Sequence, residues 1–205
     1  PPDFHKRLET VYGKDKAAAQ VPRWESLAAR WQMMGAQNPQ AATYFSAPGR
    51  TELGGNHTDH NHGSVLAASI NLDTIAMASR RNDLVVRIHS EDYPAFELNL
   101  ADLAVRKEEE GSSAALVRGV AAWFNEHGAP LCGFEAVVSS TVLRGSGLSS
   151  SASYEVLVGT ILNTLAAEGR FNAVELAIAG QFAENRYFGK PCGLMDQIAC
   201  AHGGV

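Results

Sequence analysis

The chain has 205 residues, a formal net charge of −5, 45% hydrophobic residues and 19% charged residues. This length suits one large domain or two small ones, and the composition excludes disordered and collagen-like chains. The mildly acidic balance gives no electrostatic basis for nucleic acid as the main partner. No apolar run approaches the ~20 residues of a membrane-spanning helix, so we expect no membrane partner.

Three cysteines, Cys132, Cys192 and Cys200, are present without any Cys-x-x-Cys pair. Their odd number and spacing disfavour a disulfide framework and a zinc ribbon, so we expect reduced thiols in a cytoplasmic protein. The first residues, PPDFHKRLET, lack an initiator methionine and the apolar region of a signal peptide. We therefore expect a cut piece of a longer chain.

The N-terminal segment predicts an amphipathic helix packed on the domain. Pro22 suits its first turn and Gly35 its C-terminal stop. Apolar residues follow the spacing of one helix face at Trp24, Leu27, Ala28, Trp31 and Met34.

Short β-prone runs follow, at residues 43–45, 65–70, 74–79, 84–89 and 95–100. Their alternation and the turn residues between them predict strands of an antiparallel meander. A sixth strand is predicted at 134–138. Helical stripes lie at 116–124 and 154–165, and Asn172 with Glu175 has the spacing of a capping box for another helix. The fold class is therefore α+β, in one domain.

A Gly/Ser-rich loop at residues 144–153 lies between a predicted strand and a predicted helix. A helix start presents unpaired N–H groups and the positive end of the dipole, which suits a phosphate. Glycines let the backbone approach the anion, and hydroxyls add hydrogen bonds or hold Mg²⁺. The Walker A spacing is absent. Candidate phosphate-binding residues are Gly145, Ser146, Gly147, Leu148, Ser149, Ser150 and Ser151.

A polar loop at residues 47–63 gathers Arg50, Glu52, Asn56, His57 and Asp59. Carboxylates and amides on such a loop suit a hydroxyl-rich ligand. A metal site through His57, His60 and His62 is the alternative, but their spacing matches no zinc pattern. For His60 and His62 we expect incidental surface positions. A third stretch, the turn at 191–197 with Asp196, is a weak signal alone, because a lone Asp at a turn is most often a cap.

Together the three stretches resemble one family. APGRTELGGNHTDHNHG resembles the galactokinase signature, GSGLSSSAS resembles the phosphate loop of the GHMP small-molecule kinases, and AENRYFGKPCGLMDQ resembles the galactokinase segment with the catalytic Asp. They occur in the family's order. The resemblance implies a GHMP-kinase N-terminal domain over residues 1–205, with a mixed or antiparallel sheet and packed helices.

The resemblance also implies an activity: ATP-dependent phosphorylation of galactose at its C1 hydroxyl. Arg50 and Asp196 would be the catalytic pair, with Asp196 taking or orienting the hydroxyl proton. The sugar-binding residues would be Asn56, His57, Asp59 and Gly193. The phosphate loop would hold ATP, and Ser150, or its neighbour, with Glu184 would hold Mg²⁺, a hard ion that prefers oxygen ligands.

Two departures from the family pattern matter. Within the signature, Asn56 stands where the family usually has Glu, His60 stands where it usually has Tyr, and Glu52-Leu53-Gly54-Gly55 replaces Asn-Leu-Ile-Gly. An amide accepts a sugar hydrogen bond without charge assistance, which leaves another sugar, such as N-acetylgalactosamine, open as substrate. A non-catalytic sensor of sugar and ATP is the other alternative. Galactokinases also continue into a C-terminal domain, so we expect this piece to lack that partner domain and to be inactive by itself.

Overall fold

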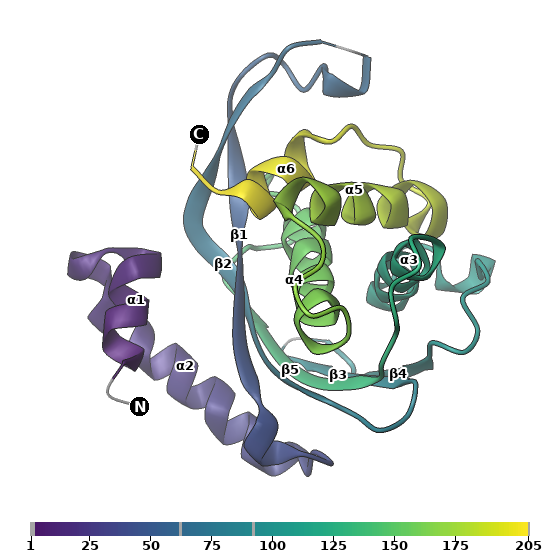
Figure 1. Ribbon diagram of the computed structural model, residues 1–205. Coiled ribbons are helices and arrows are strands. Elements are labelled where there is room, and N and C mark those ends of the chain that lie inside the picture. The colour runs from purple at the N-terminus through teal and green to yellow at the C-terminus, as the bar shows by residue number, and fades with distance from the viewer. Residues whose placement is uncertain (1–2, 62, 92, 205) are drawn as a thin grey trace.

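A single curved sheet forms the centre of the protein, with helices on both of its faces (Figure 1). The structure is a computed structural model that describes residues 3–61, 63–91 and 93–204. Within these ranges no helix combines the length and apolar character needed to cross a membrane. The sheet has the strands β1 (Thr43–Gly54), β2 (Leu66–Arg80), β3 (Val85–Ser90), β4 (Phe96–Asn99) and β5 (Phe134–Ser140).

The strand order is β1-β2-β5-β3-β4, which corrects the predicted meander. Strand β5 inserts between β2 and β3, antiparallel to the first and parallel to the second. A parallel pair needs a long crossover, and β4 with helix α3 (Ser113–Glu126) supplies it. The first six residues of β5 are buried, as a central strand covered on both faces requires.

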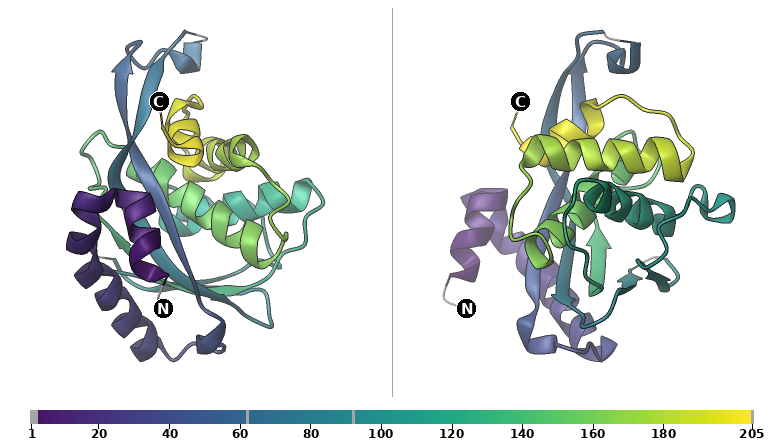
Figure 2. Two further views of the ribbon diagram at one scale, coloured as in Figure 1. Left: turned by 60° about the vertical axis from the view of Figure 1, so that its left-hand side comes forward. Right: turned by 45° about the vertical axis from the view of Figure 1, so that its right-hand side comes forward.

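Strands β1 and β2 are longer than predicted and form an arm that extends beyond the rest of the sheet (Figure 2). The runs at 65–70 and 74–79 are one strand, because Asp73 between them is hydrogen-bonded within the fold and does not form a turn. Its carboxylate accepts from Tyr12 and Ser46, each at 2.6 Å, and from Arg23. Arg50 likewise lies within β1, where a loop was predicted.

Helices α3, α4 (Ser150–Leu165), α5 (Ala173–Ala183) and α6 (Met195–His202) cover the concave face. The main core lies between α3, α4 and the sheet, where Phe124, Phe134, Leu157 and Ile88 are buried. Each such side chain contributes about 1.5–3 kcal/mol by leaving water. The capping box predicted from Asn172 and Glu175 is confirmed at the start of α5. A π-helical turn, η4 (Glu184–Phe188), follows α5 directly.

Helices α1 (Phe4–Tyr12) and α2 (Lys14–Met34) lie against the other face of the sheet. Leu27 and Trp31 of α2 pack on Ile75 and Val137, which confirms the predicted amphipathic helix. Its start was predicted wrongly, because Pro22 lies inside α2 and not in its first turn. Short 3-10 turns complete the fold: η1 (Pro39–Ala41), η2 (Asp59–Asn61) and η3 (Lys107–Glu109).

Candidate active site

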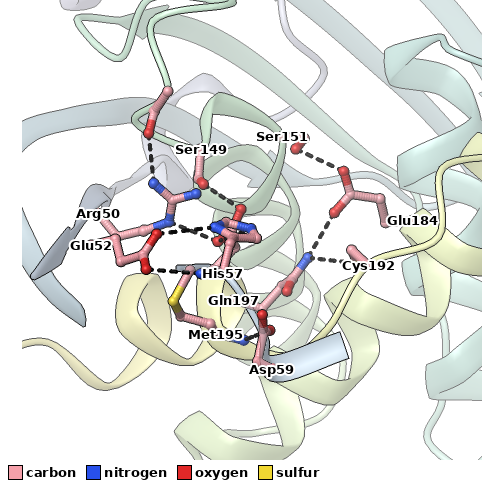
Figure 3. A network of polar contacts seen from close by, with 12 residues as sticks. Arg50, Glu52, His57, Asp59, Ser149, Ser151, Glu184, Cys192, Met195 and Gln197 are labelled. Atoms are coloured by element: carbon pink, nitrogen blue, oxygen red, sulfur yellow. Dashed lines mark hydrogen bonds and ion pairs between the residues drawn. The ribbon is translucent and has the colours of Figure 1, made fainter. Parts of the chain in front are cut away.

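Arg50 of β1 and Asp196 of α6 form a partly buried ion pair at the centre of the candidate site (Figure 3). The Arg50 Nε donates to the Asp196 Oδ1 at 2.7 Å, and another guanidinium nitrogen donates to the Gly147 carbonyl at 2.6 Å. The sequence-based expectation that these two side chains meet is confirmed. The Arg50 guanidinium thereby joins β1 to the start of α6, where Asp196 lies, and to the phosphate loop at residues 144–153.

The phosphate loop leads into the N-terminus of α4, as predicted. Gly145 and Gly147 both have φ of 76°, and Ser149 at the N-cap has φ of 59°. These left-handed conformations favour glycine, and the two glycines supply them at little cost. The Ser149 hydroxyl donates to the Asp196 carboxylate. The loop is also tied to β1, because the Arg50 backbone N–H donates to the Leu148 carbonyl at 3.1 Å.

The electrostatic balance at Asp196 keeps its carboxylate ionised. Burial acts to raise the pKa of Asp196. Hydrogen bonds from Arg50 and Ser149, with the charges of Arg50 and His57, outweigh burial and hold that pKa below its usual value. The site therefore presents an anionic acceptor for a proton next to a fixed cation.

At the tip of the β1–β2 arm, Asn56 and His57 have left-handed backbones, with φ of 52° and 55°. Glu52 holds this turn: its carboxylate accepts from the His57 backbone N–H at 2.8 Å and lies 3.4 Å from the His57 Nδ1. The opposite ring nitrogen lies 3.6 Å from the Asp196 Oδ1. Asn56 itself is exposed at the tip. Glu52 and His57 thus link the arm to the Arg50–Asp196 pair.

Asp59 and Gly193 meet where the arm approaches the start of α6. The Asp59 Oδ2 accepts from the Met195 backbone N–H at 3.0 Å. A Cβ added at Gly193 would lie 1.9 Å from the same oxygen, so only glycine fits there. The Asp59 Oδ1 is buried without a hydrogen-bond partner among the described residues. A buried acceptor of this kind is available to a ligand hydroxyl.

A second carboxylate, Glu184, lies on the other side of the phosphate loop and is 1% exposed. Its Oε1 accepts from the Ser151 hydroxyl at 3.0 Å and from the Lys190 ammonium at 3.3 Å. A carboxylate with a hydroxyl is a hard oxygen donor set of the kind that suits Mg²⁺. Ser151 is therefore the serine that the structure brings to Glu184, and Ser150 lines the neighbouring cavity.

That cavity, of about 160 Å³, opens between the phosphate loop, β5 and α3. Apolar side chains line much of it, including Leu116, Val138 and Phe188. The Tyr154 hydroxyl on its wall is buried and has no hydrogen-bond partner within the described chain. A flat apolar group with a polar edge fits such a cavity.

Sequence reasoning missed several residues of this region: Glu52 as the support of the turn, Gln197, Glu155, Lys190 and Tyr154. Glu155 carried no signal, because it lies in a helix among apolar neighbours, and Gln197 lies inside a singled-out stretch without having been given a role. Lys190 and Glu52 lie inside the stretches that were singled out. Ser146, a predicted loop residue, bonds within the loop to the Leu143 carbonyl at 2.6 Å.

The alternative metal site on the arm receives no support from the geometry. Among residues 3–61, 63–91 and 93–204, no three His, Cys, Asp or Glu side chains converge as metal ligands. His62 lies outside the described residues. The three cysteines are free thiols.

Comparisons with known proteins agree with the geometry. A family model described as the GHMP kinases N terminal domain matches residues 115–204, and one described as the galactokinase galactose-binding signature matches residues 32–80. The chain belongs to the GHMP kinase family. Within that family, its likeness is to the galactokinases.

Two curated galactokinases are similar to this chain in sequence. A galactokinase of Clostridium acetobutylicum is 39% identical over 163 residues, and one of Bacillus subtilis is 38% identical over 164 residues. Each match covers 78% of this chain and 41% of the relative. The chain thus spans about two fifths of the length of these relatives.

A solved structure, Lactococcus lactis galactokinase complexed with galactose, matches with a TM-score of 0.79 and 33% identity. This match covers 86% of this chain and 45% of that one. It confirms the α+β GHMP-kinase N-terminal fold that the sequence predicts.

Proposed function

We propose that this chain forms the N-terminal domain of a galactokinase, which transfers the γ-phosphoryl group of ATP to the C1 hydroxyl of galactose. The single observation that carries the proposal is the convergence on Asp196. Arg50 from the sugar signature and Ser149 from the phosphate loop both donate to this carboxylate. A sugar hydroxyl and a phosphoryl group would meet there. The relatives are named galactokinases, which favours galactose over N-acetylgalactosamine.

In the proposed reaction, Asp196 is the base. Its low pKa keeps it ionised at neutral pH, ready to accept the C1 hydroxyl proton as the oxygen attacks the γ-phosphorus. The bond from that phosphorus to the bridging oxygen breaks, and ADP leaves. Arg50 orients Asp196 and stabilises negative charge on the transferring group.

The arm and the Asp turn would hold the sugar. Asp59 has a buried oxygen, Oδ1, without a partner among the described residues, and glycine at position 193 leaves room for the Asp59 carboxylate to hold its place. His57 and Asn56 lie at the tip and would complete the hydroxyl contacts at residues 47–63. Most of the ligand-facing groups are short and polar, which suits a monosaccharide.

The phosphate loop and the adjoining cavity would hold ATP. Residues 145–151 offer backbone N–H groups at the start of α4, and the apolar cavity beside them has room for part of the nucleoside. Glu184 and Ser151 would hold Mg²⁺, with Ser150 next to them. The ion would neutralise charge on the phosphates.

Two further assignments accompany this proposal. The relatives are more than twice as long as the matched region, so we infer that a C-terminal domain completes the nucleotide cleft and that this chain alone does not turn over ATP. The three free thiols favour the cytoplasm.

The test is a coupled ADP-release assay on the full-length protein with galactose, N-acetylgalactosamine and no sugar. We expect ADP release with galactose, and phosphate at C1 of the product by NMR. Preference for N-acetylgalactosamine would assign the substrate differently. Sugar and ATP binding by calorimetry without any ADP release would identify a sensor and refute the kinase.

A further inference from the structure

The Gln197 side chain bridges two buried carboxyl groups, those of Glu155 and Glu184, and Figure 3 shows its contact with Glu184. Its Nε2 donates to the Glu184 Oε2 at 2.8 Å and to the Glu155 Oε2 at 3.0 Å. Glu155 and Gln197 are completely buried, and Glu184 is 1% exposed. One amide nitrogen therefore joins α4, α6 and the junction of α5 with η4.

This bridge leaves polar atoms unpaired in the core, which is unfavourable for folding. The Glu155 Oε1 and the Gln197 Oε1 are buried without partners among the described residues. An unpaired polar atom in a core opposes folding, and apolar side chains of similar volume are often at least as stabilising. Packing alone therefore does not account for the bridge.

Helix α5 packs closely against the bridge at Gly180. A Cβ added at Gly180 of α5 would lie 3.0 Å from the Glu155 Oε2 and 3.1 Å from the Gln197 Cγ. Glycine at this position therefore lets the α5 backbone pack close beside the Glu155 and Gln197 side chains. Complete burial and two hydrogen bonds hold the Gln197 donor toward Glu184.

The bridge determines which way the Glu184 carboxylate points. Its Oε2 is occupied by Gln197, and its Oε1 faces Ser151 and Lys190 on the side of the phosphate loop. Lys190 is 63% exposed, so this ammonium can move away when another cation arrives. The free face of Glu184 is therefore presented to the loop by a buried support.

We propose that Gln197, anchored by Glu155, is a positioning residue that aims the Glu184 Oε1 at the divalent cation of the bound nucleotide and sets the affinity for that cation. The inference rests on the proposed function, because it assumes that a cation binds with ATP at Glu184. It goes further by assigning a role to two buried residues that touch neither substrate. Loss of such a support typically weakens metal affinity 10–100-fold.

The experiment measures Mn²⁺ binding by electron paramagnetic resonance, in the full-length protein with ADP present. Gln197→Met keeps the approximate volume and removes the donor. We expect it to raise the Mn²⁺ dissociation constant about tenfold while galactose affinity by calorimetry stays within twofold. Gln181→Met is the matched control: this amide contacts the Cys192 carbonyl at 3.3 Å and should leave Mn²⁺ affinity unchanged.

Two Glu155 variants keep the test decisive if Gln197→Met folds poorly. Glu155→Gln retains an acceptor for the bridge and should bind Mn²⁺ within twofold of wild type. Glu155→Ala removes the anchor and should bind it several-fold more weakly. Wild-type Mn²⁺ affinity in both Gln197→Met and Glu155→Ala would overturn the inference and leave the kinase proposal intact. A wild-type protein that binds no Mn²⁺ with nucleotide would overturn both.

Discussion

Arg50 and Asp196 are 146 positions apart in the chain, and the Arg50 Nε lies 2.7 Å from the Asp196 Oδ1. No local structure requires this pairing: one residue lies on a strand and the other in the first turn of a helix. The pair also lies where the Ser149 hydroxyl arrives from the phosphate loop.

Asp196→Asn should abolish phosphoryl transfer and leave sugar binding largely intact. The amide keeps the size of the side chain but cannot accept the hydroxyl proton, and general-base catalysis contributes about 10²–10⁴-fold. The full-length variant should therefore lose at least about a hundredfold in kcat by the ADP assay. Galactose affinity by calorimetry should change only a few-fold. Equal losses in both quantities would instead assign Asp196 to binding.

Glu52→Ala should weaken galactose binding, because Glu52 holds the left-handed turn at His57. A hydrogen bond to a charged group is worth about 1.5–3 kcal/mol, so we expect a rise of roughly ten- to a hundredfold in the galactose KM. Glu52→Gln keeps an acceptor and should have a smaller effect. Glu97→Ala, which removes a carboxylate that pairs with Arg87 on the far edge of the sheet, is the control and should leave KM unchanged. An unaltered KM in Glu52→Ala would show that the turn holds without Glu52.

Gly193→Ala should reduce sugar binding without unfolding the protein. The new Cβ would lie 1.9 Å from the Asp59 Oδ2, so the carboxylate has to move from its place. Gly159→Ala in α4 is the matched control, with the nearest atom, Leu176 Cδ2, at 3.4 Å. It should retain binding and gain up to about 1 kcal/mol of stability from helix propensity. Calorimetry with galactose and thermal unfolding measure the two effects. Unchanged affinity in Gly193→Ala would place the sugar elsewhere.

Glu155→Gln should flatten the dependence of stability on pH. Burial, and then the charge of Glu184, raise the pKa of Glu155 well above its ordinary value of 4.5. The folded state therefore keeps a proton that the unfolded state releases above about that pH, so this stabilisation is lost as pH rises. The advantage of the variant should be greater at pH 8 than at pH 5. Urea unfolding across this range measures it, and parallel curves for the two proteins would contradict the assignment.

Local signals in the sequence predicted much of the fold and of the site. Asn172 with Glu175 identified a helix start, because a capping box involves only neighbouring residues. The glycines before Ser149 identified the phosphate loop for the same reason. These features depend on backbone groups within a few positions of each other, so they can be predicted without knowledge of the tertiary structure.

Long-range pairing could not be predicted in this way. The place of β5 between β2 and β3 depends on a crossover that no local pattern specifies. Asp73 lies between two runs that were predicted as separate strands, and it is a buried acceptor for Tyr12 and Arg23 within one strand. Gln197 is identified only once α4, α5 and α6 are packed together. Buried polar contacts between distant elements therefore had to come from the structure.

The bond between the Arg50 N–H and the Leu148 carbonyl has a consequence for how the two substrates would influence each other. Strand β1 and the loop touch so closely that a Cβ at Gly49 would lie 2.8 Å from the same carbonyl oxygen. Under the proposed function, a nucleotide that displaces the loop would also displace β1, the strand that carries Arg50. Thermodynamic reciprocity would then require galactose to alter nucleotide affinity by the same factor by which the nucleotide alters galactose affinity. The hydrogen bond between β1 and the phosphate loop would thus couple the binding of the two ligands through the backbone of β1.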